Sequence, residues 1–189
     1  MPIAEFSLIY RYFSHLGRGE AVDLSVGDDC AIVRLQPGER LATSVDTMVE
    51  GVHFPADSFP EDIGFRAVST AASDLAAMGA RPLGMTLALT LPSVDELWLH
   101  AFSEGVAAAV SEYRLPLVGG DTTRGPLAIS VQVLGALPQG LPSFALPWTW
   151  TCTSFVSSSR TTSWPSPRAA AASASASTAG PAPNIRHDL

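Results

Sequence analysis

The sequence predicts an α/β fold, a two-layer sandwich in which helices cover one face of an open sheet, and three observations support this prediction. Two long amphipathic helical patterns begin near Pro60 and Ser93. Apolar runs of strand length lie before, between and after them. No apolar run approaches the roughly 20 residues that a membrane span requires. Since the helices cover one face, the other face needs a different cover, and a partner subunit is the natural candidate.

The first 60 residues contain one helical pattern followed by short strands. Residues 4–16 place apolar side chains at helical spacing, so we expect an amphipathic helix that ends at the following glycine. Alternating or continuous apolar residues predict strands at 22–26 and 41–48, and residues 30–35 between them are again apolar. Residues 50–60 contain a glycine and prolines and are expected to form a loop.

The two long helices and the remaining strands follow in alternation. A helix is expected at 60–79, because a proline and two acids in its first turn suit a helix N-terminus and a glycine follows its apolar stripe. Residues 82–91 predict a strand. A capping box, Ser-x-x-Glu, opens the helix at 93–113. The last two strands are expected at 115–118 and 127–137.

A polar segment at 119–125 lies between these last two strands and is expected to be a loop. Its two adjacent glycines allow backbone N–H groups to approach a ligand closely. Asp121 can hold a hard cation, and the hydroxyls and Arg124 can reach phosphate oxygens. The segment is therefore either a metal–phosphate loop or a glycine-rich turn with a solvated aspartate.

The charge balance restricts the classes of partner. The chain has 189 residues and a net charge of −7, with 18 acids against 11 bases, all of them arginine. This charge argues against nucleic acid and anionic membranes as partners, and it suits divalent cations. Without lysine the chain has no Gly-x-x-x-x-Gly-Lys phosphate loop. Its two cysteines form no disulfide framework or zinc site, and no secretion signal is visible, so we expect a cytoplasmic location.

The composition changes abruptly near residue 140. Residues 1–140 hold 17 of the 18 acids, whereas 31 of the 49 residues at 141–189 are Ser, Ala, Pro or Thr. We therefore expect a folded domain at 1–140 and a low-complexity tail at 141–189 that packs poorly. The tail is either an out-of-frame translation of a GC-rich gene or a genuine disordered segment.

Five aspartates fall at element ends or beside strands: Asp28, Asp29, Asp46, Asp74 and Asp121. If the strands are neighbours, these carboxylates converge, and their mutual repulsion then requires Mg²⁺ or a similar ion. Alternatively, each carboxylate is solvated separately. His53, in the loop, is either a packed or solvated imidazole or a contact to an anionic or aromatic substrate.

Four motifs stand in order along residues 4–140: 27–31, 44–54, 73–82 and 119–125. Their sequences are Gly-Asp-Asp-Cys-Ala, Ser-Val-Asp-Thr-Met-Val-Glu-Gly-Val-His-Phe, Ser-Asp-Leu-Ala-Ala-Met-Gly-Ala-Arg-Pro and Gly-Gly-Asp-Thr-Thr-Arg-Gly. Together they resemble the thiamine-monophosphate kinase family. The wider superfamily includes aminoimidazole-ribonucleotide synthetase, selenophosphate synthetase and a hydrogenase-maturation protein, which share the Asp-rich ATP site. The resemblance implies the amino-terminal ATP-binding domain of that superfamily, with a mixed sheet and helices on one face.

The resemblance also implies the reaction, transfer of the γ-phosphoryl group of ATP to thiamine phosphate to give thiamine diphosphate. It implies a homodimer whose amino-terminal sheets join into a barrel, with ATP near that interface. Gly120 and Asp121 would meet ATP, and His53 the thiamine phosphate. No catalytic side chain is expected, because the attacking phosphate oxygen is already ionised and metal ions offset the repulsion between anions. The implied Mg²⁺ ligands are Asp29, Ser44, Val45, Asp46, Asp74 and Asp121.

The chain departs from the family pattern in two places. Val45 stands where the family usually has threonine, so it can offer a metal only its backbone carbonyl. After residue 140 the family continues with an arginine that contacts the nucleotide and with a second α/β domain, neither of which is recognisable here. We therefore expect the kinase function that the resemblance implies, in a truncated chain that does not complete the catalytic site alone. The alternatives are an ATP- and Mg²⁺-binding dimerisation domain without turnover, or another synthetase of the same superfamily.

Overall fold

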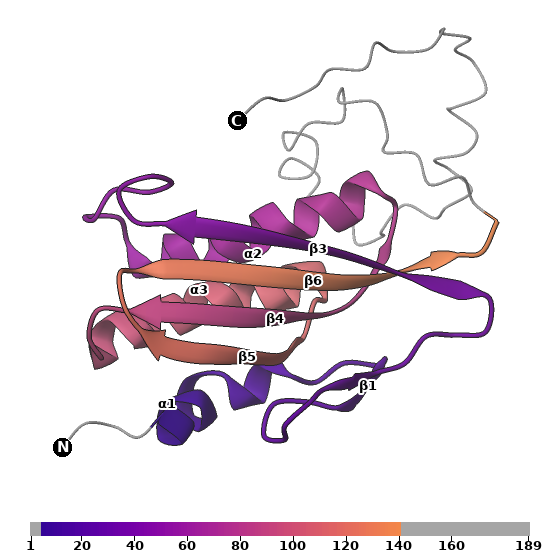
Figure 1. Cartoon of the computed structure of the whole chain (residues 1–189), viewed down its shortest axis with the longest axis horizontal. Helices are drawn as coiled ribbons and strands as arrows, with labels where there is room; N and C mark the ends of the chain where they lie inside the picture. Colours follow the sequence, from indigo (N-terminus) through magenta and orange to yellow (C-terminus); the bar gives the residue numbers. More distant parts are fainter. Residues whose placement is uncertain (1–4, 141–189) are drawn as a thin grey trace, which may run out of the picture.

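Four strands form the central sheet of the protein, whose computed structural model describes residues 5–140. In sheet order they are β3 (Glu39–Val49), β6 (Ala128–Pro138), β4 (Arg81–Leu91) and β5 (Leu117–Arg124). β4 and β5 run parallel, whereas β6 is antiparallel to both β3 and β4. The predicted mixed sheet is thus confirmed, with β3 and β5 as its two edges (Figure 1).

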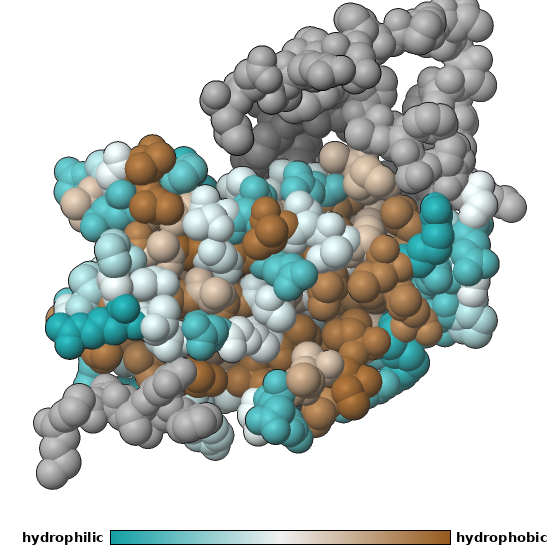
Figure 2. All heavy atoms as spheres, in the orientation of Figure 1, coloured by the Kyte–Doolittle hydropathy of each residue, from teal (hydrophilic) through white to brown (hydrophobic). Residues whose placement is uncertain are grey.

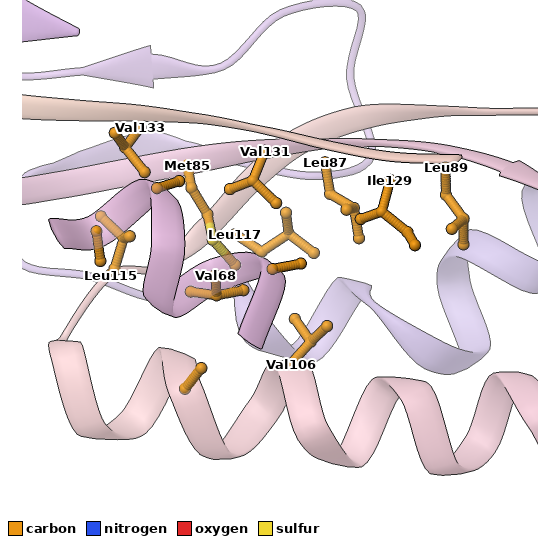
Figure 3. Close-up of a cluster of buried hydrophobic side chains, with 14 of the residues drawn as sticks. Val68, Met85, Leu87, Leu89, Val106, Leu115, Leu117, Ile129, Val131 and Val133 are labelled. Atoms are coloured by element: carbon orange, nitrogen blue, oxygen red, sulfur yellow. The ribbon is translucent and has the colours of Figure 1, made fainter. Parts of the chain in front are cut away.

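Two helices, α2 (Pro60–Ala77) and α3 (Glu96–Tyr113), cover one face of the sheet, which we call the helix face (Figure 1). Val68 and Val106 from these helices are fully buried against sheet residues such as Met85 and Ile129 (Figure 3). Successive strand residues point to opposite faces, so every second residue of a strand enters this core. The predicted α/β sandwich with helices on one face is confirmed.

α2 and α3 approach each other closely because two glycines lie at their contact. A Cβ added at Gly105 would lie 1.9 Å from the carbonyl oxygen of Glu61. A Cβ added at Gly64 would lie 2.4 Å from the carbonyl oxygen of Phe102. No side chain fits at either position, so both residues are required by helix packing.

The segment before the sheet forms a smaller unit beside β5. It contains α1 (Glu5–Tyr12), a short 3-10 helix (Ser14–Leu16), and a hairpin of β1 (Val22–Leu24) and β2 (Ile32–Val33) (Figure 1). An ion pair between Arg34 and Asp23 links the two sides of the hairpin. Both partners are about half exposed, so this pair contributes little stability.

The opposite face of the sheet, called the open face here, has no helix of residues 5–140 over it. Leu41 and Val45 of β3 are 54% and 62% exposed on this face. Figure 2 shows that apolar side chains gather on it over the strand ends nearest the β1–β2 hairpin. Such an apolar sheet face fits the expectation that something other than these helices covers it.

Several local predictions are corrected. Residues 119–124 are not a loop, because they continue β5 through parallel pairing with β4. α3 is capped by Asp95 instead of Ser93, since the Asp95 carboxylate accepts hydrogen bonds from the N–H groups of Leu97 and Trp98 at 2.9 and 3.2 Å. The first helix is shorter than predicted and ends in the 3-10 turn. No helix within residues 5–140 is long and apolar enough to cross a membrane. The predicted tail at 141–189 lies outside the described residues.

Candidate functional site

Ser44, Asp46 and Asp74 form a polar cluster at the β3 edge of the sheet, on the helix face. The alternation of β3 points Ser44 and Asp46 toward α2 and leaves Val45 on the open face. Asp74 comes from the last turns of α2, and its Oδ2 accepts a hydrogen bond from the Ser44 hydroxyl at 2.5 Å. All three cluster residues are half-buried. One strand and one helix thus bring two carboxylates and a hydroxyl together.

The electrostatics of this cluster favour a cation. Burial raises the pKa of the Asp46 carboxyl above its ordinary value, and the negative charge of Asp74 raises that pKa further. Both effects disfavour the charged form of Asp46, and a divalent cation between the carboxylates would reverse both. Carboxylate and hydroxyl oxygens are the ligands that Mg²⁺ takes in proteins. The donor set therefore fits a hard divalent cation.

A second group lies at the other edge of the sheet, where the tip of the β1–β2 hairpin approaches β5. Asp29 and the Gly119–Gly120 backbone line a hollow of about 400 Å³ between the hairpin and the open face. Most of its remaining wall is apolar, and includes Leu41, Leu83, Val118 and Leu134. An apolar hollow with a carboxylate and bare backbone at its rim can take a flat organic ring and leave charged groups outside.

Asp121 follows this hollow along β5. It pairs with Ala88 of β4, whose neighbour on β6 is Ser130, so its side chain belongs to the open face. Gly120 has a packing requirement of its own, because a Cβ there would lie 2.0 Å from the Leu87 carbonyl oxygen. Gly120 is therefore needed for β5 to pair with β4, whether or not a ligand approaches it.

The two groups lie at opposite edges of the sheet. β6 and β4 separate β3 from β5, and strand spacings of about 4.8 Å put the two edges about 14 Å apart. Within residues 5–140 no three His, Cys, Asp or Glu side chains gather closely enough to hold a metal ion. The predicted carboxylates are therefore not gathered in one place within residues 5–140 of a single chain, and their role as a shared metal site stays a prediction. The predicted residues instead form two subsets, on different faces of one sheet.

His53 belongs to neither group and lies in a tight turn that follows β3. Its N–H donates to the Val49 carbonyl at 2.9 Å, and its Nδ1 accepts a hydrogen bond from the Val49 N–H at 3.0 Å. The next residue, Phe54, is only 4% exposed and anchors the turn in the core. The ring of His53 is exposed, so the turn presents it to solvent in a fixed position.

Arg66 of α2 is a neighbour of His53 that the sequence did not reveal. Its Nη2 donates to the His53 carbonyl oxygen at 2.8 Å, across 13 residues of chain. Arg66 also lines a hollow of about 380 Å³, together with Phe54 and Phe59. No local pattern marks such a contact. The single signal is an arginine early in the helix that directly follows the histidine loop.

Comparison with known proteins places these features in a family. The family described as "AIR synthase related protein, N-terminal domain" matches residues 27–137. A thiamine-monophosphate kinase of Salmonella typhimurium is 48% identical over 141 residues, which cover 74% of this chain and 43% of that protein. The chain thus spans less than half the length of this curated relative.

Solved structures agree with the sequence comparison. The crystal structure of thiamine-monophosphate kinase from Stenotrophomonas maltophilia superposes with a TM-score of 0.60 at 44% identity, covering 64% of this chain and 38% of that one. A structure described as AaThiL complexed with AMPPCP and TMP superposes with a TM-score of 0.53 at 30% identity. That match covers 56% of this chain and 35% of the other.

Proposed function

Because this chain belongs to the family of AIR synthase related proteins by its N-terminal domain, we propose that it binds ATP with Mg²⁺ for the phosphorylation of thiamine phosphate to thiamine diphosphate. The similar proteins named thiamine-monophosphate kinase support this activity. So does the similar structure whose description names AMPPCP and TMP as bound molecules. Since ATP is the co-substrate, the proposal includes a cytoplasmic location.

The Ser44–Asp46–Asp74 cluster is the observation that carries this proposal. It holds two half-buried carboxylates, and burial and the charge of Asp74 both disfavour ionisation of Asp46. We assign Mg²⁺ to this cluster, with the Val45 backbone carbonyl beside it, and to Asp29 and Asp121 at the other edge. Gly120 and Asp121 would meet ATP at the hollow beside β5, and His53 would meet the phosphate of thiamine phosphate.

The chemistry proposed for this site requires no catalytic base. An oxygen of thiamine phosphate, already ionised, attacks the γ-phosphorus of ATP; the bond from that phosphorus to the bridging oxygen breaks, and ADP leaves. Bound Mg²⁺ would offset the charge that repels one anion from the other. The residues of this chain would bind and orient the substrates: the carboxylates would hold the cations, and the hollow would take the flat base of ATP.

We further propose that a second copy of the chain covers the open face and completes the site. Two observations support it: the exposed apolar residues on that face, and the placement of the two acidic groups at opposite edges of one sheet. If the open faces of two sheets pack against each other and their edges meet, the β3 edge of one copy can lie beside the β5 edge of the other. The carboxylates that are far apart in one chain would then share one nucleotide.

A second candidate function is an ATP- and Mg²⁺-binding dimerisation domain without turnover. It is favoured by the length of the match, which covers 43% of the similar Salmonella protein.

Calorimetry of AMPPCP binding with and without Mg²⁺, paired with an assay for thiamine diphosphate, tests both candidates on the full chain. We expect binding that depends on Mg²⁺ and is weakened at least about tenfold by Asp46→Asn, in the range seen when groups that support a metal site are removed. Asp57→Asn is the matched control, because Asp57 is an exposed acid outside both groups.

The outcomes separate the candidates. Mg²⁺-dependent binding with product supports the kinase, and the same binding without product supports the dimerisation domain. If circular dichroism shows a folded chain that binds no AMPPCP with Mg²⁺, both proposals are wrong.

A further inference from the structure

The turn that carries His53 is held at three points. At its start, the Val49 carbonyl accepts the His53 N–H, and the Val49 N–H donates to the His53 ring. At its end, Gly51 N–H donates to the Phe54 carbonyl at 2.8 Å, and Phe54 is buried. From outside the turn, Arg66 donates to the His53 carbonyl. The exposed imidazole of His53 thus belongs to a turn that is held by hydrogen bonds at Val49, at Phe54 and at the His53 carbonyl.

The bond from Val49 determines which ring nitrogen carries the hydrogen. A nitrogen that accepts a hydrogen bond from an N–H group cannot itself be protonated, so Nδ1 of His53 is bare. In the neutral ring the hydrogen then lies on Nε2, on the side away from Val49. The turn therefore offers a single N–H donor from Nε2 toward solvent, which suits an anionic oxygen acceptor.

Arg66 contributes a side-chain contact from α2 to this turn, beside the bond from the Glu50 N–H to the Leu127 carbonyl at 3.2 Å. Its guanidinium joins the His53 carbonyl, at the edge of the sheet, to α2, which packs in the core. The four hydrogen bonds within residues 49–54 are local and can open together with the turn. The bond from Arg66 ties the turn to a rigid helix and limits that opening.

We propose that Arg66 is a positioning residue that holds His53 as an Nε2–H donor for the phosphate of the substrate. This inference rests on the proposed function, in which His53 meets thiamine phosphate, and it names the residue on which that contact depends. Arg66 acts through the backbone of His53, so its loss reorients the imidazole without removing it. Pre-orientation of this kind lowers the entropy lost when a ligand binds.

Nitrogen-15 NMR of the histidine rings tests the proposal on the full chain. The chain has four histidines, and His53→Gln assigns the signals of His53. We expect the hydrogen of the neutral His53 ring on Nε2 alone. In Arg66→Gln, whose shorter and neutral side chain does not reach the His53 carbonyl, both tautomers become populated; in Arg66→Lys, which keeps a charged donor on a longer side chain, the Nε2–H tautomer returns. Arg11→Gln is the matched control, because Arg11 bonds Glu96 on α3 instead.

Calorimetry adds the substrate readout. Thiamine phosphate is expected to bind Arg66→Gln about tenfold more weakly than the unchanged chain, the effect of one misplaced hydrogen bond to a charged group. Binding of unphosphorylated thiamine should be the same in both. The Arg11→Gln control should bind thiamine phosphate as the unchanged chain does.

The two measurements test the positioning role of Arg66 and the assignment of His53 to the substrate separately. If Nδ1 carries the hydrogen in the unchanged chain, or if Arg66→Gln leaves the tautomer as it was, the positioning role is overturned. If the tautomer responds to Arg66 as expected and thiamine phosphate binds to no variant, positioning by Arg66 stands and the assignment of His53 to the substrate is overturned.

Discussion

Two effects disfavour the negative charge of Asp46: partial burial and a neighbouring carboxylate. Asp46 is half-buried, and its nearest charged neighbour, Asp74, has the same sign. The hydroxyl of Ser44 bonds Asp74 and leaves the Asp46 charge without a positive partner in the cluster. The charged form of Asp46 lowers the stability of the fold, and a bound cation would offset that charge. Such local destabilisation is common at ligand-binding sites.

The raised pKa of Asp46 predicts how stability depends on pH without metal. Its folded-state pKa lies above the ordinary value of 3.8, so the folded chain binds this proton more tightly than the unfolded chain. The contribution of Asp46 to the free energy of unfolding therefore falls as pH rises from the unfolded pKa through the folded one. At neutral pH, Asp46→Asn should raise the free energy of unfolding by about 0.5 kcal/mol, a small value because the site is partly solvated.

Urea unfolding in the presence of a chelator measures this effect at pH 7 and near pH 3. The gain should disappear near pH 3, where both forms of the unchanged chain bind the proton. Asp57→Asn, in the exposed loop, is expected to change nothing. A loss of stability in Asp46→Asn at pH 7 would contradict the assigned direction of the pKa shift.

Among the elements, the contact between α2 and α3 depends on backbone-to-backbone approach. Gly64 and Gly105 face the other helix with no side chain, and each leaves no room for one. Alanine in a helix interior is normally favoured over glycine by about 1 kcal/mol. Here the missing space opposes that preference, since the nearest atoms are backbone carbonyls that cannot rotate away.

Gly105→Ala should therefore destabilise the chain in spite of its better helix propensity. Forcing extra volume into a packed core costs about 1–3 kcal/mol, which exceeds the propensity gain. Urea unfolding measures the difference, and Ser111→Ala, on the exposed side of the same helix, is the control. Equal or higher stability of Gly105→Ala would mean that the two helices can move apart without cost.

For the whole molecule, the proposed association of two copies depends on the open face of the sheet. One side of the sheet is closed by α2 and α3, and the other exposes Leu41, Val45 and neighbouring apolar residues (Figure 2). An apolar face of this kind favours association. The open face of a second copy is also apolar, so the two faces can bury each other.

Val45→Glu is expected to weaken self-association at least about tenfold. The new carboxylate would be buried without a partner in the proposed interface, which costs several kcal/mol. Sedimentation equilibrium of the full chain measures the effect, and Ala108→Glu, an exposed position on α3 away from this face, is the control. Unchanged association of Val45→Glu would place any interface elsewhere.

The local elements could be predicted because their signals lie within a few neighbouring residues. The helical periodicity at 60–79 and 93–113 predicted α2 and α3, and the apolar residues at 41–48 predicted most of β3. Prediction failed where a local signal had two meanings. The glycines at 119 and 120 suggested a loop, yet in the tertiary structure they allow β5 to press against β4.

The sequence by itself determined the α/β class, the order of the elements and which residues carry carboxylates. The tertiary structure alone decided where those residues meet. It brought Asp74 to Ser44 and Arg66 to His53, it placed Asp121 on the far edge strand, and it placed Asp29 beside the hollow over the open face. The physical reason is that periodicity is a property of neighbouring residues, whereas strand order depends on contacts between residues far apart in the chain, whose packing energy no local pattern records.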